Sequence, residues 1–260
     1  MFTPVVWLRR RWLAKAMLGY PVYDPPHRSE ERLLSREDAI QNFNYFMQHK
    51  DDRTTHFRKW LKKYFGINIT DDQMGFRNLN SWAVSYSGLL YPMGGSPDPF
   101  IDYNTYWEGD FIGCNVLYDF GITVGQLTIL NCPGLSWAFD PTAELLPKTA
   151  AMLRREWGSG FQQPYLIGGR NPAWSYAPIH NAGQFALRMM RIQTNPKSRA
   201  KFRHEPKRMK AMTLNLLVNQ FQSAMNYVSA SYEDKLRFSK MSDEEYLNFV
   251  DSDTVRDEEC

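Results

Sequence analysis

Two side chains have the residue type and the setting for acid–base chemistry, Asp119 and His180. Asp119 lies in an apolar run beside Tyr118 and Phe120. A buried carboxylate is either paired with a cation or has a raised pKa that suits it to proton transfer. His180 follows a proline-rich loop and could act as a base. A hydrolase-type enzyme using both residues is one hypothesis; the alternative is that Asp119 is ion-paired or hydrogen-bonded and His180 caps a helix.

Other catalytic patterns are missing from the sequence. It contains no G-x-S-x-G, and none of its cysteines stands in a known catalytic signature. The five histidines include no H-E-x-x-H or H-x-H pair, which argues against a metal site. The segment Gly94-Gly95-Ser96 lacks the Lys-Ser/Thr pair of a P-loop. We therefore expect no catalytic residue, metal or cofactor.

The stretch 104–139 is predicted to organise the fold around Asp119. Thr105 and Glu108 form a T-x-x-E capping box, and apolar residues then recur every three or four positions on two faces. This pattern predicts a buried helix that ends at Gly125, followed by a hairpin with strands at 126–130 and 135–139. Because the segment is rich in glycine and β-branched residues, two strands turning at 119–121 remain an alternative.

The remaining periodicity predicts mainly helices. A helical hairpin is expected from residue 35 to Gly66 with a break at 51–52, and a T-x-x-Q box at Thr70 and Gln73 is expected to start the next helix. Further elements are expected at 163–167 (a strand), 179–193 (a helix) and beyond Pro206 (a helix). The predicted fold is α+β and predominantly helical, with about eight helices around a small antiparallel sheet of two to four strands.

Three parts of the chain are predicted: an N-terminal basic helix and arm at 1–34, a single α+β domain at 35–250, and an acidic tail at 251–260. In the N-terminal helix we expect Trp7, Leu8 and Trp12 to pack inward with the arginines at the surface. A helix lying on a membrane surface is the alternative for this segment.

Composition is that of a globular protein. The 260 residues are 43% hydrophobic and 15% aromatic, and the net charge is +3. The three cysteines form no framework, which favours a reducing compartment, and no apolar run approaches the roughly eighteen residues of a membrane span. We expect a cytoplasmic protein without a transmembrane segment.

The segment 188–210 is strongly basic and contains Glu205 as its one acid. Arg199, Lys201 and Arg203 are candidates for contacts with nucleic acid or another anionic partner, and Trp174 is a candidate for base stacking. Because the net charge is small and no nucleic-acid motif is present, a nucleic-acid-associated protein is the second hypothesis. Pairing of this segment with the acidic C-terminal region is a structural alternative.

A local resemblance favours binding over catalysis. The run from Asp119 to Leu130, closing on Trp137, resembles the helix, strand and Trp-containing hairpin of small bacterial α+β proteins of the polymorphic-toxin immunity type. The match covers about 35 residues, and Gln126 stands where a glutamate is expected. The resemblance implies a protein that neutralises a toxin by direct binding, and it carries over no functional residue.

The leading hypothesis is a non-catalytic protein that binds another protein, with a cognate toxin as the sharpest version. Hot spots of protein interfaces favour Trp, Tyr and Arg, and the proline-marked loops 91–103 and 169–178 are candidate contact surfaces. The predicted partner-binding residues are Trp107, Asp119, Trp174, Tyr176, Arg199, Lys201 and Arg203.

Overall fold

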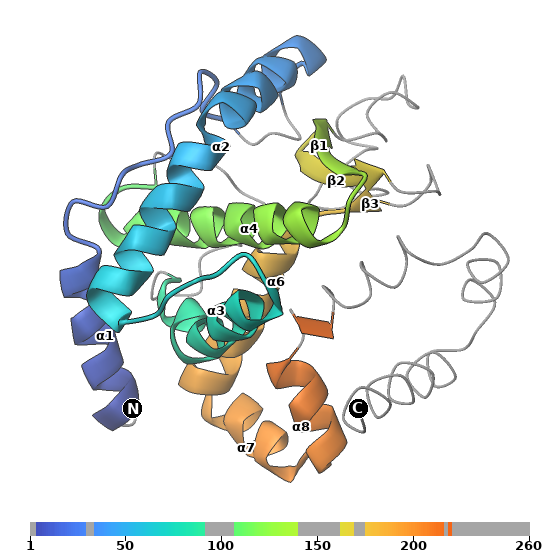
Figure 1. Cartoon of the computed structure of the whole chain (residues 1–260). Coiled ribbons are helices and arrows are strands. Elements are labelled where there is room, and N and C mark those ends of the chain that lie inside the picture. The colour runs from blue at the N-terminus through green and yellow to red at the C-terminus, as the bar shows by residue number, and fades with distance from the viewer. Residues whose placement is uncertain are drawn as a thin grey trace, which may run out of the picture.

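A computed structural model describes residues 4–29, 34–91, 107–139, 162–168, 175–215 and 218–219 (Figure 1). Its elements in chain order are α1 (Pro4–Ala16), α2 (Arg36–Phe65), α3 (Gln73–Tyr86), the 3-10 turns η2 (Ser87–Leu89) and η3 (Gly109–Phe111), α4 (Ile112–Asn131), β1 (Leu135–Phe139), β2 (Pro164–Gly168), β3 (Ser175–Tyr176), α6 (Pro178–Thr194), α7 (Pro196–His204) and α8 (Lys207–Leu214). The predicted α+β, mainly helical class is confirmed. The described residues form seven α-helices, where about eight were predicted for the whole chain.

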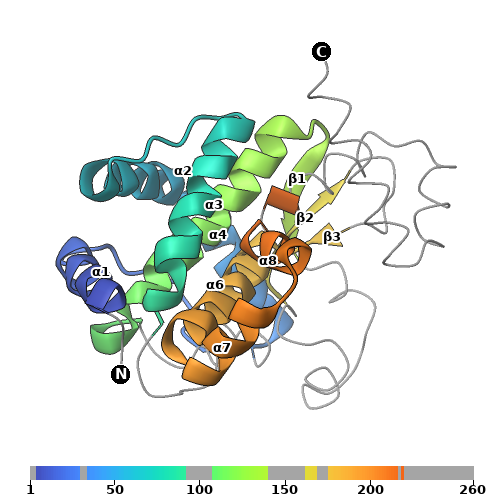
Figure 2. The same ribbon diagram turned by 90° about the horizontal axis from the view of Figure 1, so that it is seen from below.

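Helix α4 lies at the centre of the protein and packs against α2 and α6 (Figures 1 and 2). Every residue from Gly113 to Gly125 is buried. The predicted helix is therefore confirmed, and the alternative of two strands is wrong. The predicted end at Gly125 is also wrong, because the helix continues to Asn131 and the expected strand at 126–130 forms its last turns.

The glycines of α4 allow neighbouring elements to pack closely against the helix, and they do not mark its end. A Cβ on Gly121 would lie 2.5 Å from the Cα of Ile179 on α6. A Cβ on Gly125 would lie 2.2 Å from the ring of Trp137. Both contacts require a residue without a side chain, so the positions stay glycine although the helix continues.

The start of α4 also differs from the prediction. Glu108 makes no capping hydrogen bond, and Gly109 has a φ of +56°, so η3 precedes the helix. Thr105, the other half of the predicted capping box, lies outside the described residues. The amide of Asn115 donates to the carbonyl of Trp107 at 2.7 Å and holds the entry segment against the first turn.

Helix α2 is one continuous helix of 30 residues, so the predicted break at 51–52 is wrong. Its ends match the prediction: the Ser35 hydroxyl accepts from the backbone N–H of Asp38, and Gly66 ends the helix with a φ of +68°. Asp51 and Asp52 lie on the exposed side, while the buried side continues past them with Arg53. A polar pair on the outer face therefore does not interrupt the helix.

The N-cap of helix α3 lies two positions after the predicted cap. Asp72, and not Thr70, accepts from the backbone N–H of Gly75, at 2.9 Å. The Thr70 hydroxyl donates to the same carboxylate at 2.6 Å. The aspartate is the stronger cap here because a carboxylate also interacts favourably with the positive end of the helix dipole.

The sheet is antiparallel, in the order β1-β2-β3. Trp137 of β1 lies opposite Leu166 of β2, which lies opposite Tyr176 of β3, and all three are buried. The predicted strands at 135–139 and 163–167 are confirmed, but β1 pairs with β2 and not with residues 126–130.

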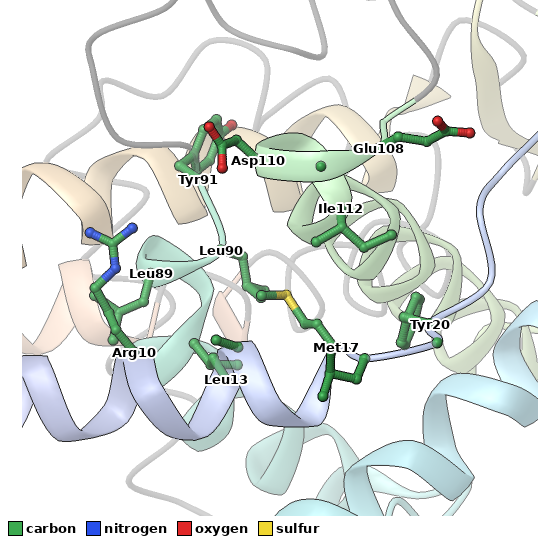
Figure 3. Close-up of a pocket in the computed structure, with 14 residues that line it drawn as sticks. Arg10, Leu13, Met17, Tyr20, Leu89, Leu90, Tyr91, Glu108, Asp110 and Ile112 are labelled. Carbon is green, nitrogen blue, oxygen red and sulfur yellow. The ribbon is translucent and has the colours of Figure 1, made fainter.

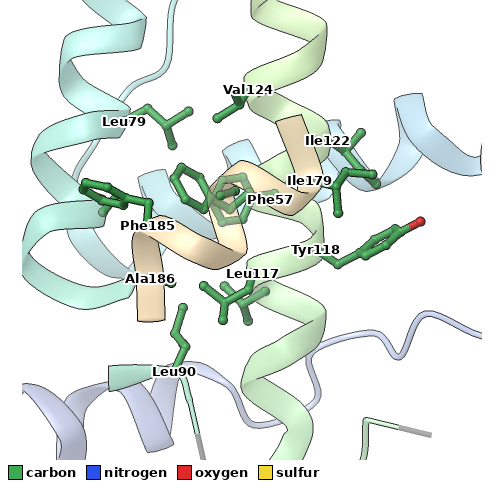
Figure 4. Packing of buried hydrophobic residues seen from close by; sticks show 14 of the residues in the cluster. Phe57, Leu79, Leu90, Leu117, Tyr118, Ile122, Val124, Ile179, Phe185 and Ala186 are labelled. Atoms are coloured by element: carbon green, nitrogen blue, oxygen red, sulfur yellow. The ribbon is translucent and has the colours of Figure 1, made fainter. Parts of the chain in front are cut away.

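One hydrophobic cluster joins α1, α2, α3, α4, α6 and the sheet, with α4 and α6 contributing Leu117 and Phe185 to it (Figure 4). Val6 and Leu13 of α1 and Tyr23 of the following arm belong to the same cluster. Residues on both sides of the predicted boundary at residue 34 therefore share one core. The predicted tail 251–260 lies outside the described residues.

Helix α1 packs on a different face from the one predicted. Val6, Leu13 and Ala16 are buried, and the Arg9 guanidinium donates to the carbonyl of Ser85 at 3.4 Å and lies over the Tyr86 ring. The exposed fractions of the large side chains expected inside are 49% for Trp7, 59% for Leu8 and 43% for Trp12. The predicted inward packing of these three residues is wrong, because a narrow stripe of smaller side chains makes the contact.

Candidate functional site

The charge on Asp119 is held in the interior. Its carboxylate accepts from Nε of Arg53 in an ion pair, from Nη2 of Arg53 at 3.0 Å and from the Tyr20 hydroxyl at 2.7 Å. The Asp119 side chain has no exposed surface. Arg53 also donates to the carbonyls of Pro21 and Val22, each at 3.3 Å. This network attaches the segment after α1 to α2 and α4.

Burial raises the pKa of the Asp119 carboxyl to about 6, and the neighbouring Arg53 guanidinium and the Tyr20 hydroxyl oppose that rise. Burial likewise raises the pKa of Tyr20 well above its usual value, and the negative charge of Asp119 adds to the effect. A raised carboxyl pKa is one mark of a catalytic acid. Here it occurs on a carboxylate that already accepts from Arg53 and Tyr20 and has no exposed surface.

Asp119 and His180 do not form a common site. Residues 119 and 121 lie about 200° apart around a helix, so their side chains leave opposite faces. Gly121 faces Ile179 on α6, the residue before His180, while Asp119 faces Arg53 on α2. The two residues expected for a hydrolase therefore lie on opposite sides of α4, which does not support that hypothesis.

An open cavity of about 600 Å³ lies on one side of α1 (Figure 3). Leu13 comes from α1 and Met17 from the turn after it. Leu89 ends η2 and Leu90 follows it, and Ile112 is the first residue of α4. This volume is within the usual range for sites that hold a small ligand or an anchoring side chain. The cavity is therefore large and open enough to receive a small ligand or a side chain of a partner.

Charges of both signs surround this apolar floor. Arg10 lies on the α1 side, and Glu108 and Asp110 lie on the side of η3 (Figure 3). Burial lowers the pKa of Arg10 somewhat, although its guanidinium stays charged at neutral pH. Tyr20 lines the same cavity and donates to Asp119, so the buried network fixes one wall.

The basic segment forms the end of α6 together with α7 and α8. Arg199 is half-buried and donates to the carbonyls of Ile192 and Gln193, which closes the C-terminal end of α6. Lys201 and Arg203 are exposed. Of the three basic residues predicted to bind a partner, Arg199 stabilises the end of α6 through these hydrogen bonds, and the other two face solvent.

The predicted aromatic contact residues have different surroundings. Trp107 is buried beside Tyr23 and Tyr118, and Tyr176 is buried in β3, where burial raises the pKa of its hydroxyl far above the usual value. Trp174 lies outside the described residues, as do the predicted contact loops over 92–103 and 169–174. Trp107, Asp119 and Tyr176 have too little exposed surface to contact a partner directly.

Sequence reasoning missed the cavity because its walls come from three separate segments. It also predicted the wrong face of α1 to be buried. One signal for the correct face was present, because Val6, Leu13 and Ala16 are spaced by seven and three residues, as on one side of a helix. Trp7 and Trp12 were predicted to be buried because large aromatic side chains usually contribute most to a hydrophobic core.

Within the described ranges, no helix combines the length and the apolar character that crossing a bilayer requires. The same residues contain no group of three or more His, Cys, Asp or Glu side chains placed to hold a metal ion. Cys114 and Cys132 are buried free thiols, and burial raises the pKa of Cys132 to about 11. No family model, curated protein or solved structure matches the chain.

Proposed function

We propose that this protein acts by binding another protein, and that the cavity beside α1 receives an anchoring side chain of the partner. The observation that carries the proposal is the open cavity of about 600 Å³ with an apolar floor and charges at its rim. Protein interfaces are built in this way, with a few anchor residues in desolvated pockets surrounded by polar groups.

The residues at the rim define the chemistry of the partner. An apolar or aromatic side chain fits against Leu13, Met17 and Leu90. A carboxylate beside that anchor is favoured by Arg10, and a lysine or arginine is favoured by Glu108 and Asp110. The partner segment therefore combines one large apolar residue with flanking charges of both signs.

The toxin-neutralising form of this proposal keeps the local sequence resemblance as its support. Residues 126–130, expected as a strand in that resemblance, are helical, and the strand that contains Trp137 is present. A toxin in the bacterial cytoplasm remains one partner to be sought by co-expression. In that experiment this chain should restore growth of cells that express the cognate toxin.

The variant Ala14→Trp tests the cavity. Ala14 is an exposed helix residue that lines the cavity, so a larger side chain there would occupy it without entering the core. We expect a partner that co-purifies with the wild-type chain to bind at least about thirtyfold more weakly, which corresponds to the loss of a hot spot. Isothermal titration with the purified partner measures the change.

Ala200→Trp is the matched control, because Ala200 is an exposed helix residue on α7. It should bind the partner as the wild type does. Equal binding by the wild type and Ala14→Trp, with both proteins folded, would refute the assignment of the cavity. Absence of any stoichiometric partner in pull-downs from the native cell would refute the proposed function itself.

A second function is favoured by one observation, the exposed cations of α7 and α8. Lys201, Arg203, Lys207 and Arg208 are exposed, with Glu205 the one acid in that part of the segment. Nucleic acid would bind such a surface with an affinity that falls steeply with salt. Lys201→Glu combined with Arg203→Glu should abolish binding to duplex DNA or RNA at low salt; if the wild type shows no binding under these conditions, this second function is excluded.

A further inference from the structure

The outward face of α1 concentrates exposed apolar surface. Among the described residues, ten large hydrophobic side chains are exposed, and five of them lie between residues 5 and 18. Val5, Trp7, Leu8 and Trp12 belong to α1, and Leu18 lies in the turn after it, where it also lines the cavity. Contiguous exposed apolar side chains of this kind mark a contact with a protein or a membrane, since isolated ones are common and scattered.

Cations alternate with the aromatic rings on this face. Arg11 follows Trp7 by one helical turn, and its guanidinium lies 4.9 Å from the ring centroid. The Lys15 ammonium lies 5.9 Å from the ring of Trp12. Helix α1 contains no aspartate or glutamate. The whole face is therefore apolar and positive, and its charge is complementary to an anionic surface.

The positive charge continues onto the neighbouring end of α2. The Trp12 indole N–H donates to the carbonyl of Tyr64 at 3.1 Å, so the last turn of α2 adjoins α1 (Figure 1). That turn carries Lys62 and Lys63, which are both exposed. The patch made by Trp7, Arg11, Trp12, Lys15, Lys62 and Lys63 is called the α1 face below.

We propose that the α1 face binds the surface of an anionic lipid bilayer, with α1 lying parallel to it. The indole rings and Leu8 enter the boundary between headgroups and acyl chains, where tryptophan is enriched. Arg11 and Lys15 extend along the rings and place their charges at the level of the lipid phosphates. A helix of 13 residues is roughly 20 Å long, too short to span the hydrocarbon layer, so it lies on the membrane.

A lipid surface fits this face better than an acidic protein does. On the α1 face, exposed tryptophans alternate with cations: Arg11 lies over the Trp7 ring and Lys15 over the Trp12 ring. A protein interface instead collects apolar anchors in a core within a polar rim, which is the arrangement of the cavity. The cavity is lined on this side by Arg10, Leu13 and Ala14 of α1 and by the turn that follows, so it borders the α1 face.

Vesicle binding tests this proposal. The full chain should co-sediment with phosphatidylcholine vesicles that contain phosphatidylglycerol, and much less with pure phosphatidylcholine vesicles or at high salt. The double variant Arg11→Gln, Lys15→Gln should weaken binding about 25-fold, because each cation near an anionic surface contributes about fivefold. The double variant Arg36→Gln, Arg77→Gln removes the same charge from the start of α2 and from α3, where both residues are exposed, and should bind as the wild type does.

Tryptophan fluorescence places the rings. Brominated lipids should quench the emission of the wild type, and Trp7→Phe should remove part of that quenching while the protein stays folded and bound. Three results would overturn the proposal: no binding to anionic vesicles, an equal loss with the control variant Arg36→Gln, Arg77→Gln, or binding without quenching. If the α1 variants lose an acidic protein partner while vesicles never bind, the α1 face is a protein interface instead.

Discussion

Helices α1 and α4 both combine aromatic side chains with charge, but they use them in opposite ways. α4 is buried on all sides, and its one charged residue, Asp119, is neutralised by Arg53. α1 buries a narrow stripe and leaves two tryptophans, Arg11 and Lys15 at the surface. The comparison shows that apolar composition alone does not decide whether a helix is buried. Burial depends on how wide the apolar face is and on how closely neighbouring elements can approach it.

The two helices should therefore respond differently to substitution. A change in α4 or in the residues that contact it removes interior packing or leaves a buried charge alone, so it should lower the free energy of unfolding. A change on the outer face of α1 alters no interior contact and should affect binding alone. The four predictions below test this separation, and each is measured by chemical or thermal denaturation of the purified chain.

Arg53→Met should produce the largest effect, a loss of about 3–5 kcal/mol in the free energy of unfolding, because it leaves Asp119 buried without its cation. It also removes the donors to the carbonyls of Pro21 and Val22. Adding Asp119→Leu to the same chain should restore part of the lost stability, since no unpaired charge is then left. If Arg53→Met alone is as stable as the wild type, the ion pair does not stabilise the attachment of the segment after α1.

The stability of the protein should depend on the ionisation of Asp119. Its pKa is raised to about 6 in the folded protein from 3.8, so the folded state binds more protons between these values. The stability that this carboxyl contributes is present below about pH 4 and is lost as the pH rises through about 6, by roughly 3 kcal/mol in all.

Asp119→Asn lacks this titration. The stability of the wild type relative to this variant, measured by urea denaturation, should therefore fall between about pH 4 and pH 6. A relative stability that instead rises with pH over this range would mean that Arg53 lowers the pKa of the carboxyl more than burial raises it. That outcome would make the ion pair a net source of stability at neutral pH.

Gly121→Ala should destabilise the protein by about 1–3 kcal/mol, although alanine favours a helix over glycine by about 1 kcal/mol. The new Cβ would lie 2.5 Å from the backbone of Ile179, so α4 and α6 must separate. A higher melting temperature than the wild type would show that helix propensity outweighs this contact. The close approach would then have no part in the packing of α4.

Much of the fold could be predicted from sequence because its signals are local. The periodicity of 112–124 predicted α4, and Ser35 and Gly66 predicted the ends of α2. The failures come from contacts with distant residues. Gly125 indicates a helix end when only its neighbours in sequence are considered, yet the helix continues and the ring of Trp137 requires a glycine there. The pairing of β1 with β2 joins two strands that are distant in the sequence, so no local pattern predicts it.

The candidate site could be predicted less well than the fold. The sequence correctly indicated that Asp119 needs a partner, and an arginine ion pair was one of the structural alternatives considered. The cavity was missed because α1, η2 and the start of α4 form it together, and no single segment carries its pattern. The orientation of α1 was missed because residue size was weighed above helical spacing.

Trp7→Ala should have the smallest effect, a change within about 0.5 kcal/mol, because surface substitutions away from caps and networks rarely exceed this. Leu13→Ala is the matched control on the same helix, since Leu13 is 1% exposed; it should cost about 2–5 kcal/mol. If Trp7→Ala destabilises the chain as much as Leu13→Ala does, α1 packs through its aromatic face and the contrast with α4 is lost. If the stability is unchanged while vesicle binding falls, Trp7 has been retained at the surface for contact with a membrane and not for folding.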